Sequence, residues 1–147
     1  MNKILLFALN DLTLGIELKY VQKIIETNDI KPIPLAPYFV SGLLNHRGSF
    51  LTIINLALLC GTTPGKVDQE ARIIILDDNE TDIGILAGKV MGTKELSFQN
   101  KKKEPIEITH GEANRFFKIT LEQAEGTPEI NILDSEKLLR FVSEYTL

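Results

Sequence analysis

The stretch PYFVSGLLNHRGSFLTIINL, residues 37–56, is mostly apolar on both sides of a short polar centre. That centre runs from Asn45 to Gly48 and contains Arg47, whose guanidinium keeps its positive charge at physiological pH. Glycine permits the tight corner that is needed where one buried segment turns into the next. We therefore expect the chain to be a scaffold that presents this corner, and Arg47 in particular, to protein partners.

The flanks of this corner and the segments before it predict short elements. Tyr38–Leu44 is expected to form a short helix or helical turn, whereas Ser49–Leu56 has the Phe, Leu, Thr and Ile content of a strand. Tyr20–Ile25 places its apolar residues on one helical face and predicts another helical turn. The prolines of Lys31–Pro37 predict a stiff, extended connector. Leu56–Cys60 is expected to wind into one further short turn.

Two hairpins with a shared pattern are predicted. Their strands are Lys3–Leu9 with Leu12–Leu18, and Arg72–Leu76 with Ile83–Ala87. The turn-forming pair Asn10-Asp11 connects the first two strands. Strict alternation after it predicts a strand with one face in the core. Each returning strand contains Gly-Ile, at Gly15 and at Gly84, and this repeat indicates two similar lobes.

The last third of the chain has weaker periodicity. No strand is predicted directly after Val90, and Lys101–Glu104 is expected to be a solvated loop because short runs of like charge usually lie in water. Strands are expected at Arg115–Leu121 and Glu129–Leu133. An amphipathic helix should follow Asp134, which is a favourable N-cap residue. Short strands, few helices and no alternation of strand and helix predict a mainly β barrel or sandwich.

Composition limits the classes of function. The 147 residues have the length of one domain, residues 1–147, and their net charge of −4 argues against general nucleic-acid binding. Cys60 is the single cysteine, so no internal disulfide is possible, and its apolar neighbours predict a buried thiol in a reducing compartment. No stretch approaches the ~20 apolar residues of a transmembrane helix. We expect a cytoplasmic protein without membrane insertion.

No arrangement of residues predicts catalysis. His46 and His110 are the only histidines, and neither has a cysteine or second histidine at ligand spacing. Phosphate-binding loops and nucleophile motifs are absent. We expect no enzyme activity, no metal and no cofactor, with a small-ligand-binding domain as a minor alternative. From the residues alone, Arg47 is either a solvated or acid-paired arginine or a partner contact, and spacing does not decide between these interpretations.

Motifs along nearly the whole chain resemble those of the CheW-like domain, the coupling protein of bacterial chemotaxis. Each motif is short, but their order and spacing together are specific. They are Phe7-x-Leu9, Gly15-Ile16-x-Leu18, Val21-x-x-Ile24-Ile25, Ile33-Pro34, Pro37, Gly42-Leu43-x-Asn45-x-Arg47-Gly48, Ile54-x-Leu56, Ile83-Gly84-Ile85, Ile132-Leu133-Asp134 and Glu136-Lys137-Leu138-Leu139.

The resemblance implies a fold and a role. The fold is mainly β, with two small five-stranded SH3-like barrels that share an apolar core and a C-terminal helix. The two lobes are expected near residues 12–77 and 78–147, with membership of the N-terminal strand in the second lobe left open. The implied role is a non-catalytic adaptor between the regulatory domain of a chemotaxis histidine kinase and the cytoplasmic tips of chemoreceptors. An adaptor of a paralogous chemotaxis-like pathway is the alternative.

The resemblance also implies which residues contact partners. Arg47, flanked by Asn45 and Gly48, matches the family's arginine in receptor and array contacts. Val21 matches an apolar contact position of the first lobe, and Gly84 matches a glycine tied to coupling. The departures from the family pattern are Lys23, His46, Asn55 and Gly88. We expect these departures to affect the choice of partner more than the fold.

Overall fold

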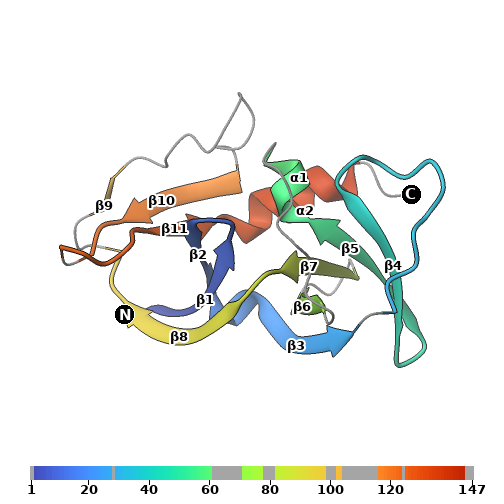
Figure 1. Cartoon of the computed structure of the whole chain (residues 1–147), viewed down its shortest axis with the longest axis horizontal. Helices are drawn as coiled ribbons and strands as arrows, with labels where there is room; N and C mark the ends of the chain where they lie inside the picture. Colours follow the sequence, from blue (N-terminus) through green and yellow to red (C-terminus); the bar gives the residue numbers. More distant parts are fainter. Residues whose placement is uncertain are drawn as a thin grey trace.

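The computed structural model describes residues 2–27, 29–60, 71–77, 82–98, 102–103, 116–123 and 125–144, and its strands form two sheets (Figure 1). In spatial order, the first sheet contains β8 (Val90–Leu96), β1 (Asn2–Leu9), β2 (Leu12–Glu17), β11 (Ile130–Leu133), β10 (Phe117–Leu121) and β9 (Lys102–Lys103). The second sheet contains β3 (Val21–Thr27), β6 (Ala71–Leu76), β7 (Ile83–Ala87), β5 (Ser49–Asn55) and β4 (Val40–His46).

The two sheets repeat one arrangement of five strands. An antiparallel hairpin, β1–β2 or β6–β7, lies at the centre of each sheet. The second strand of each hairpin pairs in parallel with a strand from elsewhere in the chain, β2 with β11 and β7 with β5. The remaining strands correspond as β8 to β3 and β10 to β4, and the two-residue β9 is an addition at one edge. The expected pair of five-stranded sheets is confirmed.

Chain order differs between the two repeats. The consecutive strands β3 to β7 all belong to one sheet, and we call this part the continuous lobe. The other sheet, the split lobe, combines the first hairpin with strands that follow residue 88. The boundary expected near residue 77 is therefore wrong, because β7 belongs with β3–β6, and β2 stays with its hairpin partner β1. The N-terminal strand β1 does lie in the same sheet as β8 to β11.

Three apolar clusters stabilise this arrangement. The interior of the split lobe is formed by Ile4, Leu121, Ile130 and Ile132, and that of the continuous lobe by Leu44, Leu51, Ile53, Ile73 and Ile75. A larger cluster lies between the lobes and takes residues from both, including Phe39, Phe116 and Phe141. The ring of Phe141 lies 5.5 Å from that of Phe39 and 5.1 Å from that of Phe116. Burial of each such side chain contributes about 1.5–3 kcal/mol, so the shared cluster joins the lobes firmly.

The central strand β2 is buried on both faces, which corrects the expectation of one buried face. Leu14 and Ile16 belong to the cluster between the lobes. Gly15 faces the interior of the split lobe, where a Cβ atom would lie 2.7 Å from Ile4 Cγ2 and 2.9 Å from Ile132 Cδ1. Alternation identified the strand correctly. It missed the second buried face because glycine fills that face without an apolar side chain.

Two short helices follow the strands that pair in parallel with the hairpins. Helix α1 (Leu56–Leu59) follows β5, and α2 (Ser135–Ser143) follows β11. Asn55 accepts a hydrogen bond from the Leu58 backbone N–H at 3.2 Å and caps α1. Asp134 caps α2 in the same way, as predicted, by accepting from the Lys137 backbone N–H at 3.1 Å.

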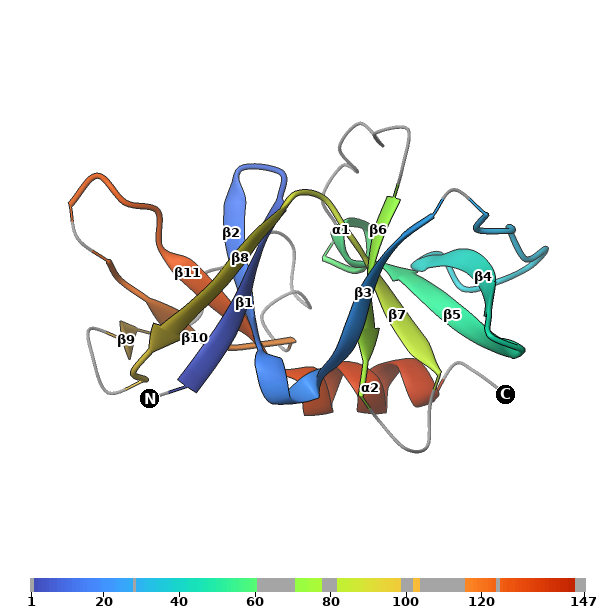
Figure 2. The same ribbon diagram turned by 90° about the horizontal axis from the view of Figure 1, so that it is seen from below.

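Helix α2 bridges the two lobes, as Figure 2 shows from below. Its apolar side, with Leu138, Phe141 and Val142, is buried in the cluster between the lobes. The amphipathic pattern of the sequence predicts an apolar stripe of Leu138, Leu139, Val142 and Tyr145. Leu138 and Val142 are buried in the cluster, Leu139 packs partly on it, and Tyr145 lies outside the described residues. Because one helix packs on both sheets, it fixes how the two barrels sit relative to each other.

Two predicted helical turns are strands. Tyr20–Ile25 contributes mainly to β3 and Tyr38–Leu44 to β4; the only turn of helix near the first is the 3₁₀ turn η1 (Leu18–Tyr20). Both strands contain a shift in register, between Val21 and Lys23 in β3 and between Val40 and Gly42 in β4. In β4 the shift breaks the alternation of apolar residues. In β3 exposure still alternates, and the exposed Ile24 beside the half-buried Ile25 makes the sequence imitate a helical period.

Several other segments differ from the sequence prediction. The connector Lys31–Pro37 is not extended throughout, because Pro34 and Leu35 form a turn. Strand β8 was not predicted, since its residues 91–95 are all exposed and leave no apolar period to detect. Lys102 and Lys103 form β9 inside the expected loop. The sequence also predicts a polar loop at Thr62–Glu70 and a polar turn at Asp77–Asp82. That loop and the middle of that turn lie outside the described residues.

Removal of the α2 cap should be measurable. Asp134→Ala deletes the acceptor for the Lys137 backbone N–H and should lower the free energy of unfolding by about 1 kcal/mol. Asp134→Asn keeps an acceptor and should stay within a few tenths of a kcal/mol of the parent. Urea unfolding followed by circular dichroism measures both. An equal loss in the two variants would contradict the capping role.

Cys60 should be chemically inert in the folded protein. Burial raises the pKa of its thiol from 9.0 to about 12. At pH 8 its reaction with Ellman's reagent should be roughly a hundredfold slower, or more, than in the urea-unfolded chain. Because the folded pKa lies above the unfolded one, the thiol favours the folded state below pH 9, and this contribution is lost as the pH rises towards 12. Equal native and unfolded reaction rates would show that the thiol is accessible.

Candidate protein-interaction surface

The tip of the β4–β5 hairpin presents Arg47 to solvent. His46 pairs with Ser49, so Arg47 and Gly48 are the two central residues of the turn. Their φ angles are +52° and +83°, which is the pattern of a type I′ turn. A Cβ on Gly48 would meet nothing within 4 Å, so this position needs glycine for its backbone angle and not for space. The predicted corner is therefore real, but it joins two strands and not a helix to a strand.

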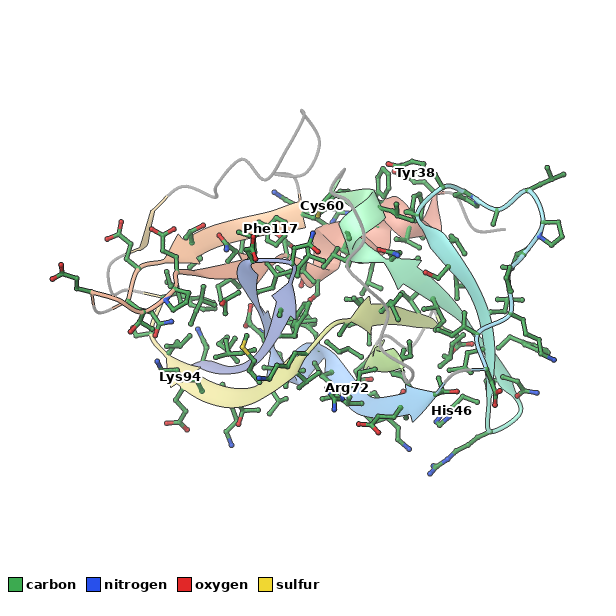
Figure 3. The ribbon with its side chains drawn as sticks, in the orientation of Figure 1. Tyr38, His46, Cys60, Arg72, Lys94 and Phe117 are labelled. Carbon is green, nitrogen blue, oxygen red and sulfur yellow. The ribbon has the colours of Figure 1, made fainter. Side chains whose placement is uncertain are left out.

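An exposed aromatic side chain lies on the same hairpin. Phe50 is 63% exposed and sits directly across from Asn45, which is also exposed. Directly opposed side chains share one face of an antiparallel pair. Leu51, the next residue, points instead into the continuous lobe. Asn45, Phe50 and the Arg47 turn thus form one surface, the hairpin surface, and His46 is half-buried beside it (Figure 3).

Strand β3 supplies a second surface at the edge of its sheet. It pairs with β6 on one side only, so its other edge has no strand partner in the sheet order of the described residues. Ile24 on this strand is 37% exposed, and Lys23 is half-buried. Val21, the predicted apolar contact, is half-buried and packs partly on the cluster between the lobes. Val21 can therefore offer only part of its side chain to a partner.

Gly84 is not on any surface, which corrects the expectation of a direct partner contact there. It lies in β7 between Ile53 of β5 and Ile75 of β6. A Cβ at this position would lie 2.6 Å from Ile73 Cγ2 and 3.1 Å from Ile53 Cδ1. Gly84 therefore acts by close packing inside the continuous lobe, as Gly15 does in the split lobe.

Two of the departures from the family pattern have structural roles. Asn55 caps α1, and an asparagine performs this role as well as an aspartate does. Gly88 lies where the chain crosses back to the split lobe, and a Cβ there would be 3.1 Å from the Ala8 carbonyl oxygen. The Ala8 N–H donates to the Lys89 carbonyl at 2.8 Å across the same crossover. Each of these two residues therefore has a role in the fold.

A polar cluster at the other crossover escaped the sequence analysis. Glu17 is buried and forms ion pairs with Lys118 and, at 3.5 Å, with Lys19. The hydroxyl of Tyr20 donates to Glu136 Oε1 at 3.2 Å and so links η1 to α2. Burial, followed by this hydrogen bond, raises the pKa of Tyr20 above 10.0. The cluster stabilises the junction between lobes, and the alternating pattern hid it by placing Glu17 on an outward face.

The described residues offer no sign of a metal site. In those ranges no three His, Cys, Asp or Glu side chains gather as metal ligands would. An open depression beside α2 is lined by Lys137, Arg140 and Phe141 of that helix and by Glu144 at its C-cap. Neither helix among the same residues has the length and apolar character needed to span a bilayer.

These features define a class of protein. Two small barrels joined through a common core present an arginine on a rigid turn, an exposed phenylalanine and an open sheet edge. Such surfaces bind proteins, since exposed aromatic and arginine side chains are the commonest interface anchors. The arrangement is that of a scaffold that acts through its surface.

Comparison with known proteins identifies the family. The model of the CheW-like domain matches residues 3–142, and the chain belongs to this family of chemotaxis coupling adaptors. It is 27% identical over 136 residues to chemotaxis protein CheW of Treponema pallidum, covering 90% of this chain and 78% of that protein. It is 25% identical over 135 residues to protein FrzA of Myxococcus xanthus, covering 91% and 82%.

Two further comparisons agree. Chemotaxis protein CheW of Thermotoga maritima is 26% identical over 95 residues, which is 65% of this chain and 62% of that protein. The crystal structure of scaffolding protein TtCheW from Thermoanaerobacter tengcongensis superimposes with a TM-score of 0.77, at 22% identity over 90% of this chain and 88% of that one. The structural match supports the two-barrel fold.

Replacement of Gly84 tests whether this residue acts by internal packing or by direct contact with a partner. Gly84→Ala should lower the free energy of unfolding by about 1–3 kcal/mol, because the added methyl overlaps Ile73. The partner affinity of the folded variant should stay within about twofold of the parent, since the residue is buried. Urea unfolding and a partner-binding titration measure the two quantities. Unchanged stability combined with lost binding would restore the contact role.

Proposed function

We propose that this protein is a non-catalytic adaptor that joins the regulatory domain of a chemotaxis histidine kinase to the cytoplasmic tips of chemoreceptors. Membership of the CheW-like family supports the adaptor role. The observation that carries the proposal is the position of Arg47, an exposed arginine held on a rigid two-residue turn.

Arg47 is poorly suited to its backbone conformation. A left-handed φ costs a residue with a side chain roughly 1–2 kcal/mol relative to the right-handed region, and asparagine or glycine bears this cost best. No burial offsets the cost, because the side chain is exposed. Its planar guanidinium can form paired hydrogen bonds with a carboxylate. A partner contact explains why an arginine occupies this position.

The hairpin surface and the β3 edge provide places for two partners. We assign the hairpin surface, with Arg47, Asn45 and Phe50, to the receptor tip. The β3 edge, with Val21 and Ile24, is assigned to the kinase regulatory domain, because its open strand and apolar residues suit another β domain. Lys23 on this edge is the departure that would tune the choice of kinase.

A second candidate is an adaptor of a paralogous chemotaxis-like pathway. The observation that favours it is the match to FrzA, a relative without the CheW name, which is as extensive as the match to the CheW of Treponema pallidum. Purification of the tagged protein from its own cells, followed by mass spectrometry, distinguishes the two pathways by the kinase and receptors recovered.

Replacement of Arg47 tests the receptor contact. Arg47→Asn suits the left-handed turn, so the free energy of unfolding should stay equal or rise by up to about 1 kcal/mol. Affinity for a purified receptor tip should fall roughly tenfold or more, because the charge is lost. Arg47→Glu, which reverses the charge, should weaken binding further. Co-sedimentation with receptor arrays and titration with the tip measure the effect.

Arg140→Asn is the matched control, since it makes the same change in charge at an exposed position of α2. Its receptor affinity should remain within about twofold of the parent. Equal binding by the Arg47→Asn variant and the parent would remove Arg47 from the receptor interface.

A further inference from the structure

The loop between β3 and β4 holds a leucine fully in solvent. Leu35 is 104% exposed, more than any other large apolar side chain among the described residues. Its φ angle is +61°, in the left-handed region. A lone exposed leucine is ordinary on a protein surface, but its combination with an unfavourable backbone angle is not. Leu35 is stabilised neither by burial nor by a suitable backbone conformation.

The chain contains its own comparison for this position. Only three non-glycine residues among those described have a positive φ: Asn10, Leu35 and Arg47. Asn10 lies in the β1–β2 turn and is of the residue type that tolerates this conformation best. Leu35 and Arg47 are residue types that tolerate a positive φ poorly, and both are exposed in the continuous lobe. Strained positions of this kind concentrate at functional sites.

Leu35 is also held rigidly. The Ala36 N–H donates to the Ile33 carbonyl at 3.4 Å, which places Pro34 and Leu35 at the centre of a turn. Proline suits the first central position, whereas the second, which needs a positive φ, usually holds glycine or asparagine. Lys31 anchors the loop to β4 through two backbone hydrogen bonds with Leu43, at 2.9 Å and 2.8 Å. These bonds restrain the backbone at Leu35, so the side chain projects from a defined position.

The loop joins β4 at its N-terminal end, and the hairpin tip lies at its C-terminal end. Both lie at the end of the continuous lobe that points away from the split lobe (Figures 1 and 2). The loop meets β4 at Leu43 and rejoins it at Val40, which are four and seven residues from Arg47, or about 13 Å and about 23 Å along the strand. One interface of standard size, about 800 Å² on each partner and so about 30 Å across, can cover both.

We propose that Leu35 is an aliphatic anchor for the partner that binds Arg47, the chemoreceptor tip. The partner would receive the leucine in a small apolar socket and would offer a carboxylate to Arg47. This inference rests on the proposed function, since it assigns a second contact to the same partner. It also explains why an aliphatic side chain occupies a turn position that disfavours it.

Two variants distinguish the effect of the Leu35 side chain on binding from the effect of its backbone conformation on stability. Leu35→Asn removes the aliphatic side chain and suits the left-handed turn, so its melting temperature should rise by about 3 °C. Its affinity for a purified receptor tip should fall about tenfold or more, as expected when an anchoring leucine is lost. Leu35→Met keeps an apolar side chain and should bind within about threefold of the parent. Isothermal titration of the full chain measures each affinity, with the kinase regulatory domain as a second probe.

The outcomes separate this inference from the proposed function. If the parent protein binds neither the receptor tip nor the kinase domain, the proposed function fails. If the parent binds the tip and Arg47→Asn weakens that binding, but Leu35→Asn does not, the anchor is overturned alone. Loss of kinase binding with intact receptor binding in Leu35→Asn would also overturn it. A melting temperature that falls in Leu35→Asn would contradict the backbone argument.

Discussion

Burial of β2 and β7 on both faces is the constraint on which the structure depends. Each is a central strand, with a barrel interior on one side and the other lobe on the opposite side. Gly15 and Gly84 satisfy this constraint because their missing side chains let isoleucines from neighbouring strands close the interior. The faces towards the other lobe carry large aliphatic residues, which form the common core. Both barrels therefore use a central glycine in the same way, and the common core between them stabilises the pair.

Much of this fold could be predicted from particular residues. The hairpins with Gly-Ile in the returning strand, the strand from Ser49 and the cap at Asp134 follow from local chemistry, and the structure contains each of them. The failures occurred where tertiary packing overrides a local period. The register shift in β4 and the exposed Ile24 in β3 imitate a helix, and the exposed residues of β8 show no period at all. The lobe boundary near residue 77 failed because it divides the β6–β7 hairpin. The place of β2 depends on its pairing with β11, a contact that no short-range pattern contains.

The candidate site was predictable in part. The turn at Arg47 and Gly48 could be located from an arginine beside a glycine between two apolar runs, and the structure places both at a hairpin tip. Phe50 could not be separated from its buried neighbours, since SFLTII is apolar without a clear polar face. Gly84 matches a family motif, and the structure shows it closely packed against Ile73 and Ile53. Sequence similarity alone cannot distinguish such a packing role from a partner contact. The exposed fraction of each side chain and the backbone φ angle, which only the structure gives, separate candidate surface residues from buried ones.

The permuted strand order has a consequence for synthesis on the ribosome. The continuous lobe has all its strands once Ala87 has left the exit tunnel, so it can fold while translation proceeds. The first hairpin leaves the tunnel earlier, yet its parallel neighbour β11 is the last strand to be translated. Pairing over such a sequence separation is slow. In the interval, Leu14 and Ile16 lack the residues of β10, β11 and α2 that complete the cluster between the lobes. The nascent hairpin is therefore the segment that a chaperone would need to shield.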